Sequence, residues 1–146
     1  MLNVILGAGR FKTLKTVPNP YMFEICGVTL IGTSGQNVDD IMKNSSITDP
    51  IDALECIVRW SHLAPTCPDT LGCFPFDGKD PFVLDKLPHI LFVGNQAKFA
   101  QKTLKLDDDK EILLVTLPKF STSASIILLN LKTLHCQPLI FSPFGK

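Results

Sequence analysis

Several short segments in the second half of the sequence are mostly apolar on both faces. Polar turn sequences such as KLDDDK and PKFSTS separate them. Successive side chains of a β-strand point to opposite faces of its sheet, so a strand that is apolar throughout needs cover on both sides. We therefore predict a layered α/β fold of the α+β kind, with strands at residues 90–93, 111–117, 126–131 and 137–141.

The first half predicts a hairpin. Residues 23–26 and 28–31 are apolar-rich segments on either side of Gly27, a pattern typical of two paired strands. The opening residues 1–11 are apolar and then glycine-rich, which indicates the end of a strand or helix followed by a loop.

Two helices are expected after the hairpin. A short helix should begin at about Asn37, with Ser34 or Asn37 as its cap. The clearest helix covers residues 50–60, because Asp49 suits the capping position, a proline occupies the first turn and apolar residues recur at helical spacing.

A long proline-rich segment separates that helix from the strand at residues 90–93. Residues 61–89 contain five prolines, which cannot continue a helix, so we expect an ordered loop. Loops of this length are usually functional or fixed by contacts. Its apolar residues Leu71, Phe74, Phe76 and Phe82 favour fixing by contacts.

The composition restricts the function classes. With 146 residues, 45% of them hydrophobic and 19% charged, the chain suits one folded domain. Fourteen basic and fourteen acidic residues give zero formal net charge, which argues against a dedicated nucleic-acid binder. No apolar run reaches the roughly 20 residues that a membrane-spanning helix needs.

The cysteines and histidines do not predict a metal site. Five scattered cysteines favour a reducing compartment, and Cys67 and Cys73 lie six positions apart, a poor match to zinc-ligand spacing. None of the three histidines has a partner at metal-ligand spacing.

Several unusual segments agree with one known family. The stretches TSGQN, HLAPT, PDTLGC, DPF and GN occur in the order seen in the small, or B, subunits of DNA polymerase delta, which this chain resembles over about residues 17–144. The resemblance implies the C-terminal half of a calcineurin-like phosphoesterase two-sheet sandwich. Residues 1–146 would then form a partial, inactive phosphoesterase-like domain, without the oligonucleotide-binding-type domain of the longer family members.

The resemblance also implies a degenerate metal site. Ser34, in the turn SGQN, and Asn95 and Ala97, in the turn GNQA, stand where active relatives carry histidine ligands. Imidazole is a strong ligand for the metals of such centres, whereas a hydroxyl and an amide oxygen are weak and a methyl group offers no ligand. We therefore expect neither a cofactor nor catalysis.

The family resemblance suggests a scaffold function. It implies a non-catalytic accessory subunit in the nucleus, bound to the polymerase catalytic subunit and to a third, extended subunit, with indirect DNA contact and no membrane. Phe74, Phe76 and Phe82 are candidate contact residues, although they would equally suit the domain's own core. Two alternatives stay open, namely an active metallophosphoesterase and a truncated half-domain without a role of its own.

Overall fold

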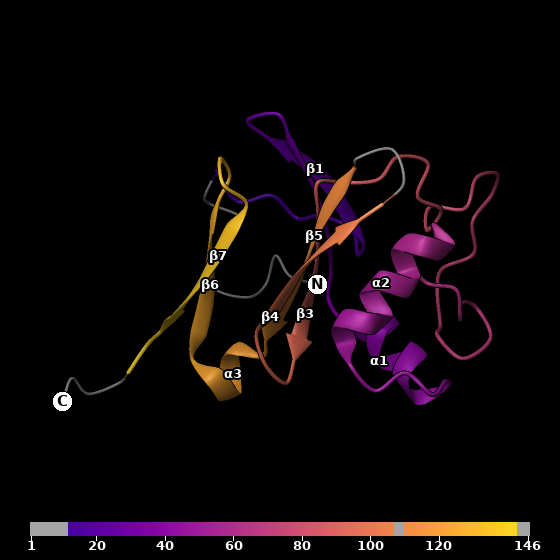
Figure 1. Cartoon of the computed structure of the whole chain (residues 1–146). Helices are drawn as coiled ribbons and strands as arrows, with labels where there is room; N and C mark the ends of the chain where they lie inside the picture. The colour runs from indigo at the N-terminus through magenta and orange to yellow at the C-terminus, as the bar shows by residue number, and fades with distance from the viewer. Residues whose placement is uncertain (1–11, 107–109, 143–146) are drawn as a thin grey trace.

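A computed structural model of the chain describes residues 12–106 and 110–142. The element expected within residues 1–11 therefore lies outside the described residues. A five-stranded sheet forms the centre, with helices on one side and a two-stranded sheet on the other (Figure 1). The strands of the central sheet are β1 (Tyr21–Ile25), β2 (Val28–Thr33), β3 (Ile90–Gln96), β4 (Ala100–Lys105) and β5 (Glu111–Pro118), in the order β1-β2-β3-β5-β4.

The middle of this sheet is parallel and buried on both faces. Strands β2, β3 and β5 run parallel, whereas β1 and β4 are antiparallel edge strands. Leu91 and Leu114 face the helices, and Ile90 and Leu113 face the second sheet. The predicted strands at residues 90–93 and 111–117, and their cover on both faces, are confirmed.

Two helices cover one face of the sheet (Figure 1). Helix α2 (Pro50–Trp60) has the predicted bounds, and the Asp49 carboxylate accepts a hydrogen bond from the Ile51 backbone N–H at 2.8 Å. Helix α1 (Gln36–Lys43) begins after Gly35 and has no side-chain cap, so the expected cap by Ser34 or Asn37 is wrong. Within the described residues, no helix is long and apolar enough to cross a membrane.

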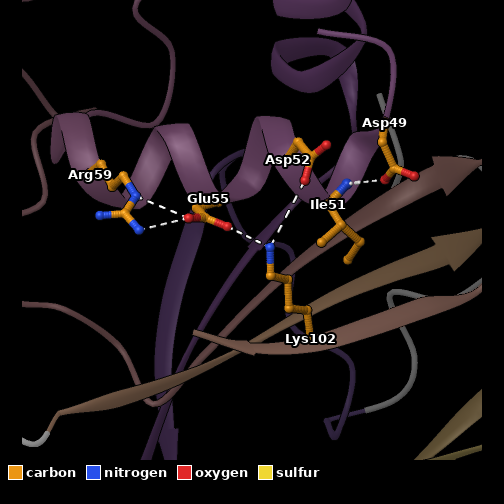
Figure 2. A network of polar contacts seen from close by, with 6 residues as sticks. All are labelled: Asp49, Ile51, Asp52, Glu55, Arg59 and Lys102. Atoms are coloured by element: carbon orange, nitrogen blue, oxygen red, sulfur yellow. Dashed lines mark hydrogen bonds and ion pairs between the residues drawn. The ribbon is translucent and has the colours of Figure 1, made fainter. Parts of the chain in front are cut away.

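An ionic network ties helix α2 to the edge strand β4. Figure 2 shows the Lys102 ammonium group of β4 between two carboxylates of α2. Its Nζ lies 2.6 Å from Glu55 Oε2 and 4.0 Å from Asp52 Oδ1. Glu55 Oε1 also accepts from both Arg59 Nε, at 3.0 Å, and Arg59 Nη2, at 2.7 Å. Glu55 therefore joins the helix to the strand.

The second sheet covers the opposite face only in part. It pairs β6 (Ser125–Asn130) with β7 (His135–Ile140), after the four-residue helix α3 (Phe120–Ser123). Cys136 is buried against the central sheet, with Ile127 and Leu129 packed beside it. Ile126, Leu128 and Leu139 are exposed. The prediction of cover on both faces is therefore wrong for these two strands, within the part of the chain that is described.

Candidate functional site

The turn between β2 and α1 is held by amide side chains. Asn19 Nδ2 donates to Ser34 Oγ at 2.7 Å, and the Ser34 backbone N–H donates to Asn19 Oδ1 at 3.0 Å. The Ser34 hydroxyl in turn donates to Gln36 Oε1. Both hydrogen-bonding functions of this hydroxyl are therefore used within the chain, which leaves it without a base that would make it a nucleophile.

The end of β3 lies directly beside this turn. Asn95 adopts a left-handed backbone conformation, with φ 57°, and its Nδ2 donates to the Ser34 carbonyl oxygen at 2.8 Å. Gly35 has φ 107°, and a Cβ at this position would lie 2.3 Å from the Gly94 carbonyl oxygen. Glycine is thus required here for two reasons, the left-handed conformation and the close approach of the two turns.

The structure brings two of the three expected positions together. Ser34 and Asn95 are hydrogen-bonded, whereas Ala97 lies exposed beyond the end of β3. The buried Gln96 between them donates to Asp39 Oδ1 at 3.2 Å. Asn95, Gln96 and Ala97 line a cavity of about 330 Å³.

These residues do not fit a dinuclear metal centre. The Ser34 hydroxyl is bound to two side chains, the Asn95 amide presents its N–H to Ser34, and Ala97 has no ligand atom. Two cations need several anionic or imidazole ligands to be held close together. Over residues 12–106 and 110–142, no group of three or more His, Cys, Asp or Glu side chains is placed to hold a metal ion.

The long loop is closed at its base. The Leu63 N–H donates to the Phe82 carbonyl at 2.8 Å, and the Leu84 N–H donates to the Ser61 carbonyl at 2.8 Å. His62 Nε2 lies 3.1 Å from Asp80 Oδ2. The Phe82 backbone N–H, and then His62, lower the pKa of Asp80 below its ordinary value. Residues 64–81 therefore form a loop whose two ends are held together.

The three phenylalanines of this loop have different environments. Phe82 is buried in the core beneath α2, and Phe76 packs edge-on against it with ring centroids 5.4 Å apart. Phe76 is 45% exposed and Phe74 is 86% exposed. Phe82 therefore holds the loop in the core, as the alternative interpretation expected, and the outer two rings are accessible.

A larger cavity lies between the loop and the Asn19 turn. Its volume is about 600 Å³. Its walls combine apolar side chains of the loop with amides of the turn, among them Asn19, Gln36, Cys67, Cys73, Phe74 and Phe76. Sequence reasoning missed Asn19 and Gln36. Two sequence features could have indicated them: Asn19 is an amide between two prolines, and Gln36 is an amide two residues after Ser34.

The fold and this site define a mixed α/β domain with uncharged polar groups at the ends of β2 and β3. The chain belongs to the DNA polymerase alpha/epsilon B-subunit family, which it matches over residues 4–101. The family resemblance seen in the sequence is thereby confirmed.

The chain is also similar to named small subunits of DNA polymerase delta. That of rice (Oryza sativa subsp. japonica) is 43% identical over 136 residues, 93% of this chain and 32% of the relative. That of Arabidopsis thaliana is 40% identical, over 93% of this chain and 31% of the relative. The Drosophila melanogaster DNA polymerase delta subunit 2 is 38% identical, over 92% of this chain and 31% of the relative. The chain thus spans about a third of the length of these relatives.

Proposed function

We propose that the chain acts as a non-catalytic accessory part of the replicative DNA polymerase delta complex in the nucleus. The observation that carries this proposal is its similarity, over 93% of its length, to a DNA polymerase delta small subunit. In this function the chain binds the catalytic subunit and a third, extended subunit, and it contacts DNA only indirectly.

The absence of catalysis is part of the same proposal. Ser34, Asn95 and Ala97 provide a hydroxyl, an amide and a methyl group where metal ligands would be needed. The hydroxyl is bonded to the Asn19 and Gln36 side chains, and the Asn95 amide donates to the Ser34 backbone carbonyl. Calorimetric titration of the purified chain with Mn²⁺ should therefore give no stoichiometric micromolar binding. Stoichiometric binding that is lost in Asn95→Ala would refute this part of the proposal.

The exposed rings of the long loop are the proposed contact with a partner. Phe74 and Phe76 offer accessible aromatic surface on a loop that Phe82 holds in the core. Aromatic side chains, phenylalanine among them, are enriched in protein–protein interfaces. Phe82 itself is better explained as a core residue, so it is not part of the proposed contact.

Co-purification with the catalytic subunit of polymerase delta, beside a phosphodiesterase assay, tests the function. We expect binding without hydrolysis, and we expect Phe74→Ala and Phe76→Ala to weaken the binding. Phe120→Ala is the matched control, because Phe120 is 57% exposed but lies on α3, outside the loop.

The other outcomes of this experiment separate the alternatives. Hydrolysis that is abolished by Ser34→Ala or Asn95→Ala would make the chain an active phosphoesterase. If neither binding nor hydrolysis occurs, the proposed function is refuted.

A further inference from the structure

Two cysteines meet at the mouth of the larger cavity. Cys67 and Cys73 both line this cavity of about 600 Å³, and their thiols are near enough to influence each other electrostatically. Both thiols are free and only partly buried. The side chains are therefore close together, accessible from the cavity and not yet bonded. Neither the polar site at the ends of β2 and β3 nor the family assignment uses them.

The two cysteines lie in parts of the loop that are held very differently. Cys67 belongs to a compact turn, in which its N–H donates to the Ala64 carbonyl at 3.1 Å and the Thr70 N–H donates to the Thr66 carbonyl at 3.1 Å. By contrast, no backbone–backbone hydrogen bond between described residues involves residues 72–81. Gly72, which precedes Cys73, has open space around its Cα. Segments with few backbone hydrogen bonds open most easily.

From this geometry we propose that Cys67 and Cys73 form a dithiol site that a hydroperoxide oxidises to an intrachain disulfide. The new bond joins the firmly held turn to residues 72–81, which carry Phe74 and Phe76 and are held by side-chain contacts without backbone–backbone hydrogen bonds. It therefore restrains the exposed rings at the mouth of the cavity. The proposal concerns the chemistry of these two thiols and stands whether or not the rings contact a polymerase subunit.

The oxidation balances with one molecule of hydrogen peroxide. The Cys73 sulfur attacks one peroxide oxygen, so that an S–O bond forms, the O–O bond breaks and the departing hydroxide leaves as water with the thiol proton. The Cys67 sulfur then attacks the Cys73 sulfur, the S–O bond breaks, and the second hydroxide leaves with the Cys67 proton. Two thiols have lost two electrons and two protons, and the peroxide has become two waters.

The environment of the thiols decides their order of reaction. Burial, and then the neighbouring Cys73 thiol, raise the pKa of Cys67 to about 11. A thiol with such a pKa is almost wholly protonated at neutral pH and is a poor first nucleophile. Cys73 is therefore the thiol that reacts first with the peroxide. The neighbouring Cys67 thiol then attacks the oxidised Cys73 sulfur and forms the disulfide.

Peptide mass spectrometry after treatment with hydrogen peroxide tests the bond directly. Trypsin cleaves after Arg59 and Lys79, so both cysteines fall within residues 60–79, which contain no other cysteine. After brief oxidation, acid quenching and alkylation, we expect this peptide to be lighter by two hydrogens and unalkylated. Dithiothreitol should restore two alkylated sites. Cys67→Ser and Cys73→Ser should each abolish the mass loss, whereas Cys26→Ser and Cys56→Ser should not.

Chymotrypsin tests whether the bond restrains the rings. In the oxidised chain, we expect cleavage after Phe76 to slow by about threefold or more, because fewer open conformations are populated. The bond after Phe74 is not a chymotrypsin site, because Pro75 follows it. Cys73→Ser treated with peroxide should show no such slowing. The proposal is overturned if residues 60–79 keep two alkylatable thiols while the exposed Cys26 is oxidised, or if Cys67 and Cys73 are found only in disulfides between chains.

Discussion

The two layers that cover the central sheet differ in how fully they are buried. On the helix side, Ala53, Leu54 and Ile57 of α2 are 0% exposed. On the other side, Leu128 of β6 is 50% exposed and Leu139 of β7 is 43% exposed. Both layers are built from strongly apolar sequences, so apolar composition alone does not explain the difference.

The difference follows from the number of apolar faces that each element presents. Helix α2 has one apolar stripe, which is buried in a core that it shares with the central sheet, α1 and the long loop. Strands β6 and β7 have apolar side chains on both faces, and the central sheet covers only one of them. A strand with two apolar faces cannot be sealed by a single neighbour, so equal substitutions in the two layers should have unequal costs.

The largest expected effect is that of Leu54→Ala in the helix layer. Leu54 is fully buried, so the substitution removes buried methyl groups and leaves a cavity. We expect the free energy of unfolding to fall by about 2–5 kcal/mol. Urea denaturation followed by circular dichroism would measure it.

The same substitution in the hairpin layer is the control. Leu128→Ala removes the same atoms from a side chain that is half exposed. The free energy of unfolding should change by no more than about 0.5 kcal/mol, as for ordinary surface positions. Equal losses for the two variants would refute the contrast between the layers.

The sequence predicted most reliably those elements whose local signals agree with their burial. Helix α2 has a capping aspartate, a proline in its first turn and one apolar stripe, and the structure gives it the predicted bounds. Strand β3 is apolar over residues 90–93 and is buried there, although it continues to Gln96. Local and tertiary preferences point the same way in both elements.

Elements whose stability depends on distant contacts were missed. Strand β4 (Ala100–Lys105) is polar and exposed at most positions, so its pattern carried no strand signal; it is an edge strand held by pairing with β5. The stretch PKFSTS was expected to be a turn but contains α3. The contact between Ser34 and Asn95 joins positions 61 residues apart, and it was the family resemblance, not a local sequence pattern, that placed both in one site.

The helix layer also depends on one close approach between two turns. Gly35→Ala would place a Cβ 2.3 Å from the Gly94 carbonyl oxygen, at a residue with φ 107°. The left-handed conformation alone should lower the free energy of unfolding by roughly 1–2 kcal/mol. Displacement of β3 from α1 by the added Cβ should lower it further. Thermal unfolding would measure the loss.

The matched variant isolates the conformational part of this effect. Gly27, in the β1–β2 turn, has φ 80° but no atom within 4 Å of an added Cβ. Gly27→Ala should therefore cost only about 1 kcal/mol. If Gly35→Ala costs no more than Gly27→Ala, the turns are not held together as tightly as their geometry indicates.

A smaller effect is expected at the start of α2. Asp49→Ala removes the acceptor for the Ile51 backbone N–H, which leaves a donor at the first turn without its partner. The loss should be about 0.5–2 kcal/mol. Asp52→Ala is the control, because Asp52 only approaches Lys102 at 4.0 Å and its side chain is 65% exposed. A smaller loss for Asp49→Ala than for Asp52→Ala would contradict the capping role.

The smallest expected effect depends on pH and concerns the junction between α2 and β4 (Figure 2). The hydrogen bond from Lys102, and then that from Arg59, lower the pKa of Glu55 below its ordinary value of 4.5. A carboxyl group whose pKa is lowered by folding stabilises the native state fully above its unfolded pKa, and that contribution disappears as the pH falls through the lowered pKa.

Glu55→Gln should therefore be less stable than the wild type at pH 7, with the difference shrinking as the pH falls below about 4.5. Because Lys102 is 44% exposed, water screens the pair, and the difference at pH 7 should not exceed about 1 kcal/mol. Urea unfolding at several pH values would measure this difference.

Glu111→Gln is the control. It removes the more exposed pair of Glu111 with Lys105, which are 3.2 Å apart, and should change the stability less at pH 7. A difference between Glu55→Gln and wild type that persists unchanged at pH 2 would show that packing of the side chain, rather than its charge, joins the helix layer to the edge of the sheet.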